Sequence, residues 1–136
     1  MQSDSLITVK SYRDLEVWQR AIELTLRIYR MSQSFPLSET YGLTSQLRRA
    51  GVSVAGNIAE GHGRITSGEF RHFLGLSRGS LCELQTQLLI ARALGYSSAN
   101  DIDECESLAN EFGKMLNAIL ASIEARHRQG NVTKGN

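Results

Sequence analysis

The sequence predicts an all-α protein that folds as an up-down-up-down antiparallel four-helix bundle. Three observations lead to this prediction. Apolar residues recur at alternating spacings of three and four along four long segments. The chain has a single proline, Pro36, and no turn-rich strand pattern. Three short breaks, "SFPLSETYG", "EGHGR" and "GYSSAND", separate the four segments, and short connections are typical of antiparallel neighbours.

The length and composition fit one domain. The chain has 136 residues, and 41% of them are hydrophobic, which is enough for a sizeable core. We expect a flexible N-terminal segment over residues 1–11, the bundle over 12–128 and a disordered tail over 129–136. The tail sequence "QGNVTKGN" is polar and offers little to bury.

The first helix is expected from about Tyr12 to Ser34 and carries two apolar stripes roughly 120° apart. One stripe comprises Val17, Ala21, Leu24, Ile28, Met31 and Phe35. The other comprises Leu15, Trp18, Ile22, Thr25 and Tyr29. Two stripes indicate more than one packing neighbour, which is either another subunit or a deeper position within one chain.

The second helix follows Pro36, whose ring excludes helical geometry for the residue before it. Ser38 is the expected cap, and Gly61 with Gly63 the expected stop. Its many small residues let two helix backbones approach closely; they are Ala50, Gly51, Ser53, Ala55, Gly56 and Ala59.

The third and fourth helices are equally periodic. Thr66 and Glu69 match a capping box at the start of the third helix. Gly75 and Gly79 lie off its apolar seam, which suggests a second close helix contact, within or between chains. The fourth helix is expected to fade near Arg128.

Composition and charge exclude several classes of protein. The net charge is +1, from 15 basic and 14 acidic residues, so the chain lacks the strong positive balance of a typical nucleic-acid binder. It has no apolar run long enough to span a membrane and no signal-peptide pattern, so we expect a cytoplasmic protein. Two cysteines, Cys82 and Cys105, are too few for a disulfide framework. Folding the last two helices about Ser97 places Cys82 level with Phe112 rather than with Cys105, so we do not expect the two to pair.

A metal site is the sharpest chemical alternative. Glu69-x-x-His72 and Glu124-x-x-His127 both match the Glu-x-x-His unit of di-iron bundles, and Glu16 and Glu60 are expected near the same end. The helical periodicity, however, turns Glu69, His72 and Glu124 outward. We therefore favour a solvated face and expect no metal or other cofactor. "GHG" lacks the Lys-Ser/Thr ending of a phosphate loop, and no serine occupies a nucleophile elbow.

Arg48 and Arg49 have two interpretations. Folding the second helix against the third about Arg64 places Arg48 level with Ser80 and within one turn of Glu83, which favours an ion pair. An arginine that faces solvent could instead contact RNA phosphates. On the same helix, Asn57 falls in the seam and needs amide partners. Glu60 opposes the helix dipole, which a cation such as Arg64 would offset.

Three segments carry a resemblance to a known family. The segments "YRDLEVWQRAIEL", "YGLTSQLRRAGVSVAGNIAEGHGR" and "EFRHFLGLSRGSLCELQTQL" resemble the four-helix-bundle proteins encoded in intervening sequences of bacterial 23S rRNA genes. The resemblance runs from about Tyr12 to Tyr96. The family includes accessory variability proteins of diversity-generating retroelements. The matching motif positions are Arg48, Arg49, Asn57, Glu60, Gly61, Ser80 and Glu83.

The resemblance implies a ring-shaped homopentamer without established catalytic residues. Its retroelement relatives imply nucleic acid and a reverse transcriptase as partners. We therefore expect a non-enzymatic oligomeric accessory or scaffold protein. The alternatives are a protein-only interaction module and a metal-dependent bundle enzyme. The candidate nucleic-acid contacts are Arg20, Arg27, Arg30, Arg126 and Arg128, whose charges Glu16, Glu23 and Glu124 could cancel.

Overall fold

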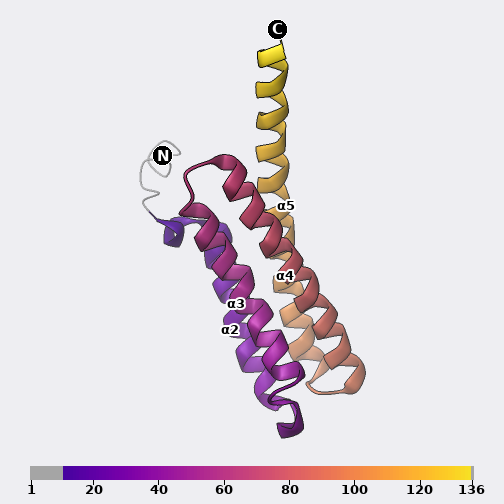
Figure 1. The fold of residues 1–136 in the computed structure, drawn as a ribbon. Helices are drawn as coiled ribbons and strands as arrows, with labels where there is room; N and C mark the ends of the chain where they lie inside the picture. Colours follow the sequence, from indigo (N-terminus) through magenta and orange to yellow (C-terminus); the bar gives the residue numbers. More distant parts are fainter. Residues whose placement is uncertain (1–10, 136) are drawn as a thin grey trace.

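The computed structural model describes the backbone of residues 11–135 and the side chains of residues 11–130. Four α-helices make up most of the described chain (Figure 1). They are α2 (Glu16–Met31), α3 (Leu43–His62), α4 (Ser67–Leu94) and α5 (Ala99–Gly135). Three short 3-10 turns complete the ordered elements: η1 (Tyr12–Asp14), η2 (Ser32–Ser34) and η3 (Leu37–Glu39). The described residues contain no strand, so the all-α prediction and the four-helix bundle are confirmed.

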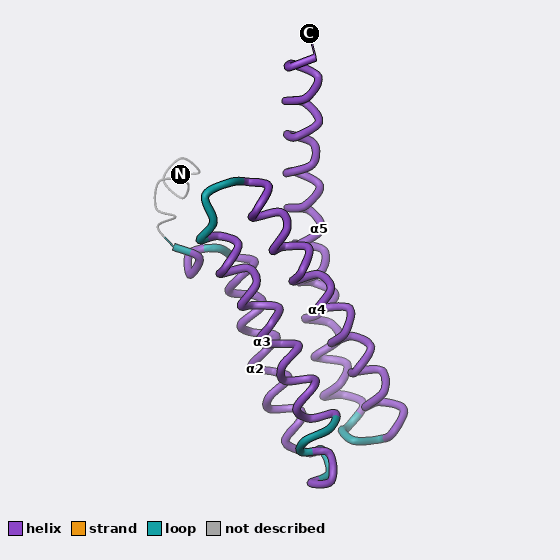
Figure 2. The backbone as a smooth tube through the Cα atoms, in the orientation of Figure 1, coloured by secondary structure: helices purple, strands orange, loops and turns teal. Residues whose placement is uncertain are grey.

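Consecutive helices lie side by side, and α5 also packs against α2, which closes the bundle around one core. Short loops join the helices at the ends of the bundle (Figure 2). The C-terminal part of α5 extends beyond the other helices (Figure 1). None of the described helices contains a stretch long and apolar enough to cross a membrane.

The two stripes of α2 have different environments. The stripe from Val17 to Phe35 is buried in the core. In the second stripe, Trp18 and Ile22 pack against the edge of that core, whereas Tyr29 is exposed. The second stripe is therefore mostly used within the chain, and only its end is available to another molecule.

Several helix ends differ from the sequence-based expectations. Ser38 does not cap α3, because that helix begins five residues later at Leu43. The Glu39 carboxylate instead accepts the Leu43 backbone N–H at 3.1 Å. The N-cap at Thr66 is confirmed, since its hydroxyl accepts the Glu69 N–H at 3.1 Å. The Glu69 carboxylate lies against that hydroxyl rather than against the Thr66 N–H.

The C-terminal boundary also differs. The end predicted near Arg128 is too early, because α5 continues to Gly135. No proline follows Arg128, and extending a formed helix is far easier than starting one. The flexible segment expected over residues 1–11 lies outside the described residues, except for Ser11, which caps η1.

Small residues set the distance between α3 and its neighbours. The Thr25 hydroxyl of α2 donates to the Gly51 carbonyl of α3 at 2.9 Å. The buried Ser77 hydroxyl of α4 donates to the Val54 carbonyl at 2.8 Å. Close backbone approach by small residues is thereby confirmed for α3. It is not found at Gly75 and Gly79, where a Cβ would meet nothing within 4 Å, so no other helix among the described residues contacts them closely.

Residue contacts fix the register of the last three helices. Gly113 of α5 lies against Leu81, and Arg92 binds Asp103, which agrees with the predicted fold about Ser97. Both cysteines are free, as the predicted offset requires. The α3–α4 register differs from the prediction, because Ser80 faces Ser53 rather than Arg48. These two helices are related about Thr66, not Arg64.

Gly61 is a point of close approach between α3 and α4. A Cβ at Gly61 would lie 2.8 Å from the Phe73 Cβ and 3.1 Å from the Phe70 Cδ1. We expect Gly61→Ala to lower the free energy of unfolding by about 1–3 kcal/mol, because a methyl group would force the helices apart.

Chemical denaturation of Gly61→Ala measures this effect. The matched control is Gly68→Ala, because Gly68 is exposed and its Cβ would be 3.9 Å from the Thr66 Oγ1. We expect that control to change stability by less than about 1 kcal/mol. Equal stability of Gly61→Ala and the unaltered protein would contradict the packing argument.

Candidate functional site

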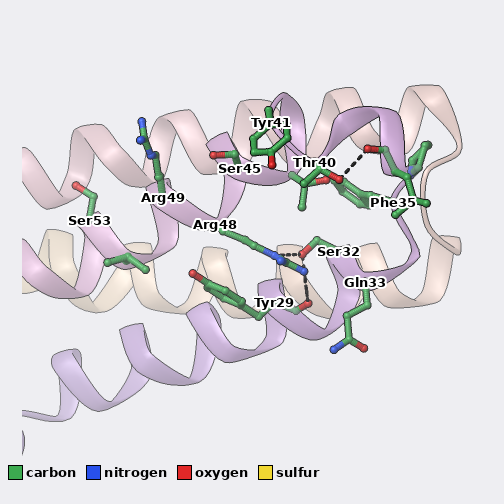
Figure 3. A pocket seen from close by; sticks show the side chains of 14 residues that line it. Tyr29, Ser32, Gln33, Phe35, Thr40, Tyr41, Ser45, Arg48, Arg49 and Ser53 are labelled. Atoms are coloured by element: carbon green, nitrogen blue, oxygen red, sulfur yellow. Dashed lines mark hydrogen bonds between the residues drawn. The ribbon is translucent and has the colours of Figure 1, made fainter.

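An open groove of about 650 Å³ lies between the C-terminal end of α2 and the first half of α3. Residues from η3 and the adjoining turn complete its wall (Figure 3). Its fourteen lining residues include two arginines and no acidic residue. The groove therefore carries positive charge that no carboxylate in its own lining compensates.

Arg48 is held in place by neutral groups of α2 and η2. Its Nε donates to the Ser32 Oγ at 2.8 Å, and an Nη donates to the Tyr29 carbonyl at 3.3 Å. Its guanidinium lies 4.8 Å from the centre of the Tyr29 ring, a cation–π geometry. The fork of the guanidinium suits several directed bonds at once, so Arg48 ties α3 to the end of α2.

The predicted ion pair of Glu83 with Arg48 or Arg49 is wrong. Among the described residues, neither arginine lies within 4 Å of a carboxylate. Successive residues of a helix point about 100° apart, so Arg48 and Arg49 cannot both face the same neighbouring helix. Arg48 consequently faces α2, whereas Arg49 extends from the other side of α3 (Figure 3).

Arg49 and Glu83 are both exposed. Neither has a hydrogen-bond or ion-pair partner within the part of the chain that the structure describes. Arg49 lines the rim of the groove. Its guanidinium is open to solvent, as a contact with a phosphate group would require.

A polar cluster joins α3 to α4 beside Arg49. The Ser53 and Ser80 hydroxyl oxygens are 2.8 Å apart. The Asn57 amide donates to the Ser53 carbonyl at 2.9 Å and to the Ser53 hydroxyl at 3.1 Å. The motif residues Asn57 and Ser80 thus meet through Ser53, which sequence reasoning did not single out as a site residue. Its position four residues before Asn57, on the same helix face, was the available signal.

Glu60 lies near the C-terminal end of α3, where its carboxylate has a partner. Arg64 donates to its carboxylate at 2.7 Å, so the expected compensation of the helix dipole is confirmed. Arg64 also lies over the Phe73 ring, 4.7 Å from its centre. Gly61, the remaining motif residue, is the point of close packing described above.

A network of hydrogen bonds closes the end of the bundle near the groove. The Tyr96 hydroxyl donates to the Glu39 carboxylate at 2.7 Å. The bond from the Leu43 N–H, followed by this one from Tyr96, holds the pKa of Glu39 below its ordinary value. The same carboxylate raises the pKa of Tyr96. Gly95, at φ 69°, supplies the left-handed turn that brings Tyr96 back toward η3.

The candidate nucleic-acid contacts divide into two groups. Arg20 binds Glu23 at 3.0 Å and Glu111 at 2.8 Å, and Arg27 binds Glu104. The hydrogen bond that Arg20 donates to Glu23 is the main reason why the pKa of Arg20 is raised. The remaining three, Arg30, Arg126 and Arg128, are exposed, and none lies within ion-pair distance of a carboxylate in the described residues. The first group therefore carries little net positive charge.

The Glu-x-x-His units are engaged in other contacts. Arg71 donates to the Glu124 carboxylate at 2.6 Å, and this bond holds the pKa of Glu124 below its ordinary value. Within residues 11–130, no three His, Cys, Asp or Glu side chains gather where they could hold a metal ion.

Burial raises the pKa of Cys105 to about 11, which keeps that thiol protonated at neutral pH.

Comparisons with known proteins give one family and one similar solved structure. The sequence model of a family described as 23S rRNA-intervening sequence protein matches residues 13–118. A solved structure that is similar is a crystal structure of a protein of unknown function from the S23 ribosomal protein family of Bacteroides thetaiotaomicron. The TM-score is 0.71 at 19% identity, and the match covers 76% of this chain and 97% of that one. At that identity the likeness concerns the fold. No curated protein matches the chain.

Arg48 offers a test of the groove's construction. We expect Arg48→Lys to lower the free energy of unfolding by about 1–2 kcal/mol, because an ammonium keeps the charge but cannot reproduce the directed bonds to Ser32 and Tyr29. Thermal unfolding followed by circular dichroism measures the change. Arg30→Lys is the control and should leave the melting temperature unaltered, since Arg30 is exposed and unpaired. Equal losses in the two variants would show that the bonds of Arg48 contribute nothing.

Proposed function

Because the chain belongs to the 23S rRNA-intervening sequence protein family, we propose that it acts as a cytoplasmic, non-enzymatic accessory or scaffold protein. Its protomer is an up-down-up-down antiparallel bundle, and five protomers form a closed ring. RNA is the proposed partner of the ring, and the resemblance to retroelement accessory proteins adds a reverse transcriptase.

One observation carries the proposal of a ring. The protomer exposes large apolar side chains in two groups. One surrounds the groove, with Leu37, Tyr41 and Val52. The other runs along α4, with Leu76, Ile90 and Leu94. Exposed apolar surface of this kind commonly marks a protein interface. Contacts between different parts of neighbouring protomers form closed rings where the rotation between them closes.

We predict that the purified protein is a homopentamer at micromolar concentration. The interfaces of a closed ring bury apolar surface that a monomer leaves in water, and this burial favours assembly. Light scattering coupled to size-exclusion chromatography gives the mass directly. A mass near the 15.1 kDa of one chain would refute the oligomeric scaffold, and a different closed oligomer would refute the pentamer alone.

A second candidate function is weak RNA binding. The unpaired Arg30, Arg126 and Arg128 support it, because a ring would repeat each of these charges by symmetry. Contacts to phosphate release counterions, so binding should weaken steeply as salt rises and depend little on sequence.

We expect Arg126→Ala/Arg128→Ala to weaken the binding of a structured RNA in a filter assay and to reduce its salt dependence. Arg20→Ala is the matched control, because Arg20 already binds two carboxylates, and its removal should alter binding much less. An assembled ring that retains no RNA at low salt would leave a protein-only interaction module.

A further inference from the structure

Helix α5 continues past the helices that cover its inner face. Ile123 is its last buried residue among those described, and the C-terminal part of the helix extends beyond the rest of the bundle (Figure 1). Within the next two turns the same face carries Arg126, His127 and Gly130, all of them exposed. The inner face therefore changes from apolar to polar and basic where its neighbours end.

A cleft of about 520 Å³ lies between this face and the start of α4. Ser67 and Phe70 line it from α4, and Ile123, Arg126, His127 and Gly130 line it from α5. We call this space the α4–α5 cleft. Its volume falls within the range of about 300–1,000 Å³ that is typical of ligand sites.

The α4–α5 cleft carries positive charge. None of its lining residues is acidic, and Arg126 has no carboxylate within ion-pair distance among the described residues. The carboxylate closest to it in sequence, that of Glu124, is bound by Arg71 at 2.6 Å. The cleft also lies at the N-terminal end of α4, where the helix dipole favours an anion. A ligand that fits the cleft therefore carries negative charge.

The walls of the cleft suit a flat group. Phe70 contributes an aromatic ring from α4, and His127 contributes an imidazole from α5. The Phe70 ring is half-buried and packs edge-to-face with His62, which holds it in place. A Cβ at Gly130 would meet nothing within 4 Å, so this side of the cleft has room. Nucleobases stack on aromatic and histidine side chains, and a nucleotide joins such a flat ring to an anionic phosphate.

We infer that the α4–α5 cleft receives an unpaired nucleotide of single-stranded RNA, with the base between Phe70 and His127 and the phosphate on Arg126. The Ser67 hydroxyl lies on the same wall as Phe70 and bonds to the edge of the base. Arg128 lines an adjoining hollow that also includes His127, and it contacts the neighbouring phosphate. This inference rests on the proposed RNA binding and names its site and the state of the strand.

Such a site distinguishes strand state and not sequence. A base within a duplex is paired and stacked on its neighbours, so it cannot enter the cleft, whereas an unpaired base can. Every nucleobase has a face that stacks on a ring, so the identity of the base matters little.

Filling the cleft tests the inference. Fluorescence anisotropy of a labelled oligouridine at low salt gives the affinity of the full-length protein. We expect Gly130→Phe to weaken this binding on the order of tenfold, because the new ring takes the place of the base. Ala125→Phe is the matched control, since Ala125 is exposed on α5 and does not line the cleft. It should bind oligouridine like the unaltered protein, and circular dichroism confirms that both variants are folded.

A second set of variants covers the case in which Gly130→Phe fails to fold. His127 is exposed, so its replacement leaves the core intact. His127→Ala should weaken oligouridine binding on the order of tenfold, and His127→Phe should restore most of the affinity, because it returns a ring to the wall. His72→Ala is the matched control, since His72 is an exposed histidine of α4 outside the cleft, and its binding should be unaltered.

Three further probes identify what the cleft recognises. An abasic strand of the same length and charge should bind more weakly than oligouridine. A blunt RNA duplex should bind equally to the unaltered protein and to His127→Ala, because its bases cannot reach the ring. If polyglutamate displaces the labelled strand as well as unlabelled oligouridine does, the cleft attracts charge alone and the inference is overturned.

The outcomes separate this site from the proposed function. If the unaltered protein binds neither oligouridine nor structured RNA at low salt, the proposed RNA binding fails and the cleft fails with it. If it binds structured RNA but not oligouridine, RNA binding stands and the cleft is refuted. The cleft alone is also refuted if folded Gly130→Phe and His127→Ala bind oligouridine as tightly as the unaltered protein.

Discussion

The close contact between α3 and α4 is the constraint on which the rest of the structure depends. At Gly61 the α3 backbone lies so near Phe70 and Phe73 that a single methyl group has no room. Ser77, buried in the same interface, bonds to the Val54 carbonyl, so the two helices are held at both polar and apolar points. This contact fixes the register that brings Ser53 to Ser80. It thereby decides which side chains of both helices turn outward.

The groove is a consequence of how α3 meets α2 on its other side. Gly51 accepts the Thr25 hydroxyl, and Arg48 reaches the end of α2, so the two helices are joined at successive turns of α3. Pro36 and η3 lead the chain away from the bundle and back, and that detour forms the wall of the groove. Arg48 is oriented without a carboxylate, and the positive charge that it contributes therefore remains available to a partner.

The nearly neutral composition conceals an uneven surface. Most arginines that pair with carboxylates do so between neighbouring helices, as Arg71 does with Glu124 and Arg92 with Asp103. Exposed pairs of this kind contribute little stability individually. They do remove charge from one part of the surface and leave it in others, at Arg49, Arg30 and the outer part of α5. Net charge alone therefore says little about which surfaces can attract a partner.

The sequence by itself determined the helical class, the four segments, the buried stripe of α2 and the α4–α5 register. Each depends on local periodicity or on a short turn, and both are encoded by neighbouring residues. The motif positions Arg48, Asn57 and Ser80 could be named from the sequence, but their partners could not. Helix α3 begins at Leu43 because Glu39, held by the distant Tyr96, supplies its cap. Arg48 faces α2, where Ser32 and Tyr29 hold it, and Glu83 lies on the exposed side of α4. Only the tertiary structure decided these features, since they depend on how far two helices can approach and not on the order of residues within either one.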